Sequence, residues 1–170
     1  DNIVQLGDFI TFDSVSSHNL NKPLELEGRR MWDEIEIAKE AFLLIQDGIE
    51  QAKNQDRKNK KKVYSPHLIW CEGNHEDRVR KYIEKYPQLE GFIDYRKHFN
   101  PNKYDWEFIR YKEYGYINNI AFTHVPMAGD NRPIRGRHSL KNTIRDHMSH
   151  IVYGHTHCMG VESDGFRGID

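Results

Sequence analysis

Cysteine is scarce in this sequence, with two residues in 170, and Cys71 and Cys158 show no Cys-x-x-Cys spacing. This scarcity excludes a disulfide framework and a zinc site built on thiolates, and it favours a reducing compartment such as the cytoplasm. Long apolar runs are missing too, so no segment is typical of a membrane span, and the first residues lack the pattern of a signal peptide. The composition therefore argues against a secreted, disulfide-rich or membrane protein.

An excess of charge of either sign is also missing. The 25 Lys and Arg residues against 26 Asp and Glu residues make no electrostatic case for nucleic acid as a partner. With 37% hydrophobic residues and a mean hydropathy of −0.85, the composition indicates a soluble chain that can bury a core in one domain. Because the sequence begins directly before an apolar segment and stops just after an expected turn, we expect a single domain over residues 1–170 that has been cut at both ends from something longer.

Short apolar segments alternate with helical patterns along the chain. Buried strands are expected over 3–6, 63–71 and 151–153, and 106–111 with 117–123 predict a hairpin turning at Gly115. Short helices are expected over 76–86 and 137–148. A longer helix from Glu27 has one apolar stripe, which consists of Met31, Ile35, Ala38, Phe42, Ile45, Ile49 and Ala52. Strands that alternate with helices indicate an α/β fold.

A basic run follows that helix, over residues 55–62. Cations suit the C-terminal end of a helix, so a solvated face is the favoured interpretation and a nucleic-acid contact the alternative.

Polar side chains gather where the expected strands end. The strands are followed by Gly7-Asp8, by Gly73-Asn74-His75-Glu76, by His124 and by Gly154-His155-Thr156-His157. In α/β sheets such strand ends are where ligands bind. Mixed Asp, Asn and His ligands suit Mn²⁺, Fe or Zn²⁺, and two such ions about 3.5–4 Å apart can clamp a phosphoryl group during displacement.

Each of these pieces also has an ordinary explanation. Gly-Asn is turn chemistry, so His75 taken alone could be a loop residue, and an isolated His-x-His is more often incidental. The remaining histidines are interpreted as core or turn residues, and these are His18, His67, His98, His147 and His150. It is the four groups in this order that point to a metal centre.

Those four groups resemble the ordered motifs of the calcineurin-like metallophosphoesterases, which are GD, GNH[DE], a lone His and GHxH. Here they are GD at 7–8, GNHE at 73–76, TH at 123–124 and GHTH at 154–157, so the likeness spans almost the whole chain. The resemblance implies a sandwich of two mixed β-sheets flanked by helices, and two divalent metal ions. Mn²⁺ is the first expectation, with Zn²⁺, Fe, Ni²⁺ or Mg²⁺ as alternatives.

The resemblance also implies a role for each motif residue. Asp8 would bridge the two ions. Asn74, His124 and His155 would bind the second ion, and His157 the first.

His75 would not be a ligand under this resemblance. It would contact the phosphate and protonate the leaving oxygen, which makes it the expected catalytic acid.

Two departures from the family's pattern stand out. The family opens with a strand that ends in Asp-x-His and supplies two ligands of the first ion, but no Asp-x-His occurs in this sequence. We expect that strand to have been cut away or to lie on another piece. The family also often places an acid or histidine three residues after the Asp of GD, to orient the catalytic histidine. Here that position is Thr11, and Asp13 is a substitute whose side chain would have to come from a different face.

Three cationic residues are candidates for binding substrate phosphate. Arg137 and His138 lie in a loop rich in Gly, Pro and Arg, which is either a phosphate contact or a solvated loop. Arg78 is the third, with a helix-surface charge as the alternative.

The function that these residues imply is metal-dependent hydrolysis of a phosphomonoester or phosphodiester. The charged loop gives a slight preference for a nucleotide or nucleic-acid phosphodiester as the substrate. Fold and motifs do not choose the substrate. The alternative is a non-catalytic scaffold of the same fold that serves protein interactions.

Overall fold

The computed structural model describes most of the chain. The described residues are 1–134, 139–147, 150–157 and 159–162. Arg137, His138 and Cys158 lie outside them, so the expectations placed on the first two stay predictions.

Sheet A consists of three parallel strands in the order β1 (Asn2–Gln5), β2 (His67–Cys71) and β3 (Trp106–Ile109). In the central strand, Leu68 to Cys71 are all buried. A continuous apolar run of this kind is typical of a parallel strand covered on both faces. The strands therefore form where the apolar segments predict them, and Pro66 precedes β2 rather than interrupting it.

Sheet B contains β4 (Gly115–Ile117), β5 (Ile120–Thr123) and β6 (His150–Tyr153). β4 and β5 are antiparallel, whereas β5 and β6 are parallel. The expected hairpin between 106–111 and 117–123 is wrong, because β3 pairs with β2 in the other sheet. The hairpin that does form turns after β4, where Asn118 takes a left-handed backbone conformation with φ 52°.

The described helices differ greatly in length. The long one is α2 (Met31–Lys58), with 28 residues, and α3 (Asp77–Lys85) and α5 (Ser139–Asp146) are the next in size. The short elements are α1 (Pro23–Leu26), α4 (Arg96–Phe99) and the 3₁₀ turns at Asp13–Val15, Pro87–Leu89 and Pro101–Tyr104. Pro87 ends α3 as its missing N–H requires.

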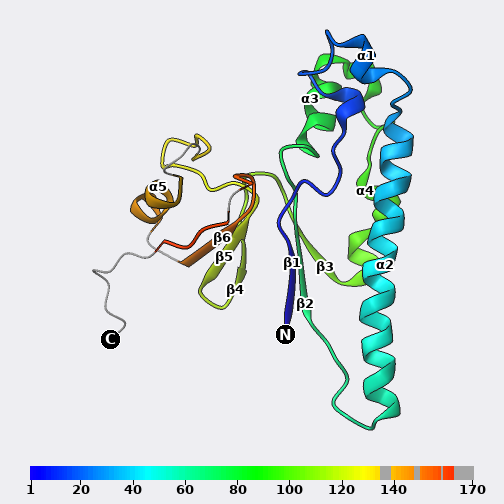
Figure 1. Ribbon diagram of the computed structural model, residues 1–170, viewed down its shortest axis with the longest axis vertical. Helices are drawn as coiled ribbons and strands as arrows, with labels where there is room; N and C mark the ends of the chain where they lie inside the picture. Colours follow the sequence, from blue (N-terminus) through cyan, green and yellow to red (C-terminus); the bar gives the residue numbers. More distant parts are fainter. Residues whose placement is uncertain (135–138, 148–149, 158, 163–170) are drawn as a thin grey trace.

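Helix α2 covers one face of sheet A, with α4 beside it (Figure 1). Phe42 lies near the centre of this layer, with its ring 5.2 Å from Trp70 and 6.2 Å from Trp106, measured between centroids. The expected stripe is partly wrong, because Ile45 and Ala52 are exposed while Gln46 is buried. The buried face of α2 is therefore rotated around the helix axis relative to the stripe that the sequence predicts.

A second apolar cluster joins the two sheets. Ile69, Cys71 and Ile109 of sheet A pack with Ile117 of sheet B, and Phe122 lies against them. The fold is therefore mixed α/β with two small sheets and flanking helices (Figure 1). Only sheet B is mixed, whereas the strands of sheet A are all parallel, which corrects the expectation of two mixed sheets.

Within the described residues, none of the helices combines the length and the apolar character that crossing a membrane requires.

Candidate metal centre

The turn after β1 brings its backbone against a histidine of sheet B. Gly7 and Asp8 both have positive φ, at 92° and 57°. A Cβ on Gly7 would lie 2.4 Å from Nδ1 of His124 and 2.8 Å from Cα of Gly73. Only glycine fits at this position, because the close approach and the left-handed backbone each exclude a side chain.

The loop after β2 touches that turn directly. A Cβ on Gly73 would lie 2.2 Å from the backbone nitrogen of Asp8 and 2.3 Å from its Oδ1. The same Oδ1 accepts a hydrogen bond from the backbone N–H of His75 at 3.0 Å. The carboxylate of Asp8 therefore holds the neighbouring loop while its other oxygen, Oδ2, faces the histidines.

The side chain of Glu76 joins the loop after β1 to the loop after β2. Its carboxylate accepts hydrogen bonds from the backbone N–H groups of Asp8, Gly73 and Ile10, at 3.1, 2.9 and 2.9 Å. The side chain is 1% exposed, and burial raises the pKa of its carboxyl to about 7. This role of Glu76 was not expected from the sequence, although one signal was available, an acid at a strand end directly after the expected catalytic histidine.

His124 presents a defined nitrogen to the site. Its Nδ1 lies 2.7 Å from the carbonyl oxygen of Leu6, and because a carbonyl only accepts, this nitrogen must carry the proton. In the neutral ring Nε2 is then an acceptor. That atom lies 2.9 Å from Oδ1 of Asn74 and 3.4 Å from Oδ2 of Asp8. A histidine whose other nitrogen donates to a backbone carbonyl is the usual arrangement of a metal ligand.

His155 completes the group from the end of β6. Its Nδ1 lies 2.7 Å from Oδ1 of Asn74 and 3.3 Å from Nε2 of His124. Its φ of 66° is left-handed, a strained conformation that clusters at functional sites. Asp8, Asn74, His124 and His155 therefore converge through two oxygen atoms and two ring nitrogens, of which Nδ1 of His155 donates or accepts according to its tautomer.

The spacing of these four atoms resembles that of ligands around one ion. Ligands at about 2.0–2.2 Å from a metal stand about 3.0–3.5 Å from each other in tetrahedral or octahedral geometry. The contacts of Asn74 with the two histidines, of the histidines with each other and of Asp8 with His124 run from 2.7 to 3.4 Å. Counting only His, Cys, Asp and Glu, however, no group of three or more in the described part of the chain is arranged to hold a metal ion. Asp8, His124 and His155 are residues of these types, so the convergence depends on the amide oxygen of Asn74, which contacts both histidines.

A cavity of about 350 Å³ opens over these residues, lined by Asp8, His124, His155 and His157 among others. His157 is exposed, and we find no hydrogen bond between it and the described side chains. Nε2 of His75 lies 3.8 Å from Oδ2 of Asp8. Burial lowers the pKa of His75, against the opposing effect of the Asp8 charge. His75 therefore lies beside the four converging atoms rather than among them.

Arg78 is already occupied by the loop after β1. Its Nη1 donates to the carbonyl oxygen of Thr11 at 2.6 Å and to Oδ1 of Asp13 at 2.8 Å. Asp13 also pairs with Arg29 at 3.0 Å, so it is held by two arginines and not by His75. The structure therefore gives Arg78 a role in holding the loop and gives Asp13 no direct contact with the catalytic candidate.

Three of the histidines that were not expected to act in the site have structural contacts elsewhere in the described chain. His67 pairs with Glu107 at 3.0 Å, His98 packs its ring against Trp32, and Nε2 of His147 lies 3.4 Å from the hydroxyl of Tyr114.

Comparisons with known proteins supply no relative for this arrangement: no family model, no curated protein and no solved structure matches the chain.

Proposed function

We propose that the protein is a metal-dependent phosphoesterase of the metallophosphoesterase type, with its two sheets forming part of that sandwich. The observation that carries the proposal is the meeting of carboxylate and amide oxygens of Asp8 and Asn74 with ring nitrogens of His124 and His155, at 2.7 to 3.4 Å. Acceptors brought this close repel unless a proton or a cation lies between them.

Protons alone also offer arrangements without an ion: Nδ1 of His155 could donate to Oδ1 of Asn74, and a protonated His124 could donate from Nε2 to Asp8. A rotated amide is a further one. If Asn74 turned its Nδ2 toward the histidines, it could donate to His124 and His155 together. With His124 neutral, Oδ2 of Asp8 would still face Nε2 of His124 at 3.4 Å with no hydrogen between them. A cation satisfies all four atoms at once, so we favour it. Asp and Asn oxygens with imidazole nitrogens suit a borderline ion such as Mn²⁺, Zn²⁺, Fe or Ni²⁺, with Mg²⁺ as a further alternative.

Two such ions would supply charge neutralisation for the attacking and leaving oxygens of an in-line displacement at phosphorus. Asp8 would bridge them, and His157 would add to the first ion from the rim of the cavity. His75, whose Nε2 lies 3.8 Å from Oδ2 of Asp8, would hold a proton for the leaving oxygen. Its own backbone N–H is held by Asp8, so the acid and the bridging carboxylate move together.

The substrate class is proposed more broadly than the reaction. A phosphomonoester or phosphodiester fits the site, and a nucleotide or nucleic-acid phosphodiester is the first candidate among them. We place this activity in the cytoplasm, because the scarcity of cysteine favours a reducing compartment.

Hydrolysis of bis-p-nitrophenyl phosphate tests the proposal. We expect turnover with Mn²⁺ and its loss with EDTA, restored by added Mn²⁺. Absence of turnover with each of Mn²⁺, Ni²⁺, Zn²⁺ and Mg²⁺, together with absence of metal binding by calorimetry, would overturn it.

A non-catalytic scaffold of the same fold is the second candidate. It is favoured by the finding that the described His, Cys, Asp and Glu residues form no metal-holding group of three. Calorimetry separates the two, because a scaffold of this kind predicts no tight binding of Mn²⁺ at the strand ends.

A further inference from the structure

Helix α2 has a second apolar face that the rest of the described chain leaves exposed. We call it the outer stripe. Ile37 is 69% exposed, Leu44 72% and Ile45 36%. The outer stripe consists of Ile37, Ala41, Leu44, Ile45, Gly48 and Ala52, all of them exposed.

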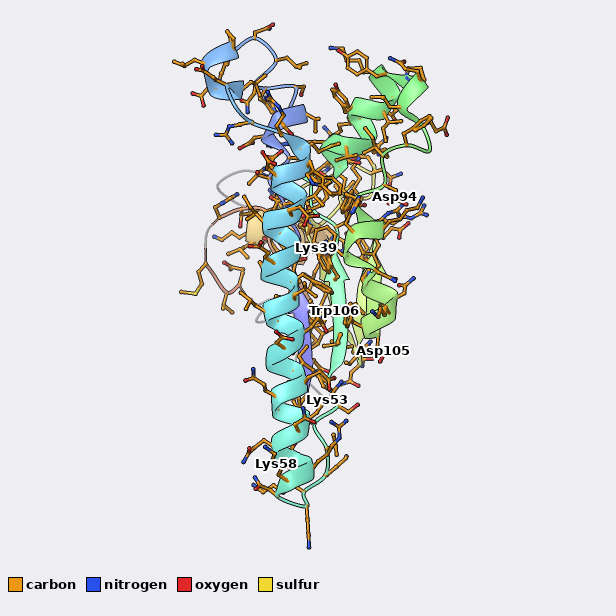
Figure 2. All side chains as sticks on the ribbon, turned by 90° about the vertical axis from the view of Figure 1, so that its right-hand side faces the viewer. Lys39, Lys53, Lys58, Asp94, Asp105 and Trp106 are labelled. Atoms are coloured by element: carbon orange, nitrogen blue, oxygen red, sulfur yellow. The ribbon has the colours of Figure 1, made fainter. Side chains whose placement is uncertain are left out.

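The outer stripe adjoins the buried face of α2 on the side away from α4. At about 100° per residue, it is centred roughly 115° around the helix from the buried residues. On the other side of the buried face, Trp32 packs its ring against His98 of α4 at 4.9 Å. Figure 2 shows α4 and the segment that leads to Trp106 along one flank of α2. The apolar surface therefore continues from the core onto a flank that α4 does not cover.

The stripe has the relief of a helix-packing surface. Ala41 and Gly48 are seven residues apart and alternate with Ile37 and Leu44, which are also seven residues apart. A Cβ on Gly48 would meet nothing within 4 Å among the described residues. Small residues between large ones form the depressions into which side chains of a second helix fit, over about 22 Å of α2.

An acidic margin borders the outer stripe on its solvent side. It consists of Asp33, Glu40 and Asp47, which are exposed and form no ion pair with any described residue. Other acids of α2 are paired, as Glu36 is with Lys39 and Glu50 with Lys53. The unpaired acids therefore lie beside the apolar stripe and would attract cationic side chains of whatever covers it.

The negative charge of the acidic margin disfavours some of the molecules that could cover the outer stripe. A membrane surface attracts helices with a basic polar face, so acids beside the stripe disfavour it. A second copy packed antiparallel through the same stripe would bring the acidic margins of two helices together, which like-charge repulsion disfavours. An amphipathic helix with an apolar face and a basic flank satisfies both the stripe and its margin.

We propose that the outer stripe is the docking site of a partner protein's amphipathic helix, whose leucines or similar side chains fill the depressions at Ala41 and Gly48 and whose Lys or Arg side chains pair with the acidic margin. This goes beyond the phosphoesterase proposal and does not depend on it.

Synthetic 20-residue helical peptides test the docking site. One peptide carries Leu at helical spacing with Lys at the flanking positions, and the other carries Glu in place of every Lys. By fluorescence anisotropy we expect the Lys peptide to bind at least about tenfold more tightly than the Glu peptide. Replacing Ile37 and Leu44 together by Ser should weaken binding about tenfold or more. Leu43→Ser, at an exposed leucine on the far side of α2, is the matched control and should change little.

The margin is tested in the same assay. Glu40→Gln with Asp47→Gln should weaken binding of the Lys peptide and reduce its dependence on salt, whereas Glu36→Gln with Glu50→Gln should do neither. Binding of neither peptide, or equal binding of both, would overturn the proposal. So would a dimer in sedimentation velocity that Leu44→Ser dissociates, because the occupant would then be a second copy.

Discussion

The two halves of the candidate metal centre are built in different ways. The half at the end of sheet A is held by its own backbone, because the carboxylates of Asp8 and Glu76 accept N–H groups from both of its loops. The half at the end of sheet B is positioned by contacts with the other half. His124 donates to the carbonyl of Leu6, and His155 lies against Asn74, so both histidines are located by groups that belong to sheet A.

This difference suggests which groups control metal binding. In the half at the end of sheet A, which we call the braced half, a side chain keeps its place when a neighbouring side chain is removed. In the half at the end of sheet B, removing one contact releases the histidine that depends on it. We therefore expect the largest losses where a residue serves both halves, and smaller ones where a residue serves a single loop.

Asn74 serves both halves, because its Oδ1 lies within 3 Å of both histidines. Asn74→Ala should lower the affinity for Mn²⁺ by at least about 100-fold and abolish turnover. His157→Ala is the comparison, since His157 is exposed at the rim, and the tight ion should remain. Calorimetry on residues 1–170 should detect one tightly bound ion and a second that is weak, because in the proposed site Asp8 and His157 would be the ligands of the latter. Two tight ions would mean that further ligands come from within this sequence.

His75 belongs to the braced half but lies beside the converging atoms. His75→Ala should lower turnover by about 10²–10⁴-fold while metal occupancy stays nearly unchanged, because a positioned general acid contributes that much. The measurement pairs steady-state kinetics with metal analysis of the same sample. Loss of the ion would assign His75 a ligand role instead.

The carboxylate of Glu76 holds the two loops of the braced half together. Glu76→Gln keeps the size of the side chain but turns one acceptor into a donor that faces a backbone N–H. We expect the affinity for Mn²⁺ to fall about 10–100-fold, as for other groups that position ligands. Glu72→Gln is the matched control, since that carboxylate accepts from Tyr95 and from the backbone of Tyr111, away from Asp8.

A thermal unfolding scan without metal separates this role from general stability. If the Glu76 variant lost stability but bound Mn²⁺ as tightly as the wild type at low temperature, the brace would have no part in the metal centre.

Arg78 serves one loop only, and its effect should be the smallest. Arg78→Ala removes hydrogen bonds to Thr11 and Asp13, which should cost about 1–3 kcal/mol of unfolding free energy. KM for the phosphodiester should stay unchanged, because the guanidinium is turned toward the loop. A rise in KM without loss of stability would return Arg78 to the substrate.

The long helix and the parallel strands could be predicted from the sequence, because apolar period and turn residues act locally. The hairpin could not. Its two segments are adjacent in sequence, and only the pairing of β3 with β2 removes one of them to the other sheet. The prediction of which face of α2 is buried was partly wrong for a related reason. An apolar arc wide enough to include Ile45 and Ile49 does not specify the direction of packing, and in the structure the buried face includes Gln46.

What the sequence determined by itself is the set of chemical groups and their places at strand ends, because residue type and local backbone preference decide both. Four glycine-containing or histidine-containing turns follow four apolar strands, and that much can be read without a structure. Only the tertiary structure decided that Asp8, Asn74, His124 and His155 meet, that Arg78 is occupied, and that Glu76 joins the loops. Contacts between residues more than 60 positions apart depend on how sheets pair and pack, which no local pattern specifies.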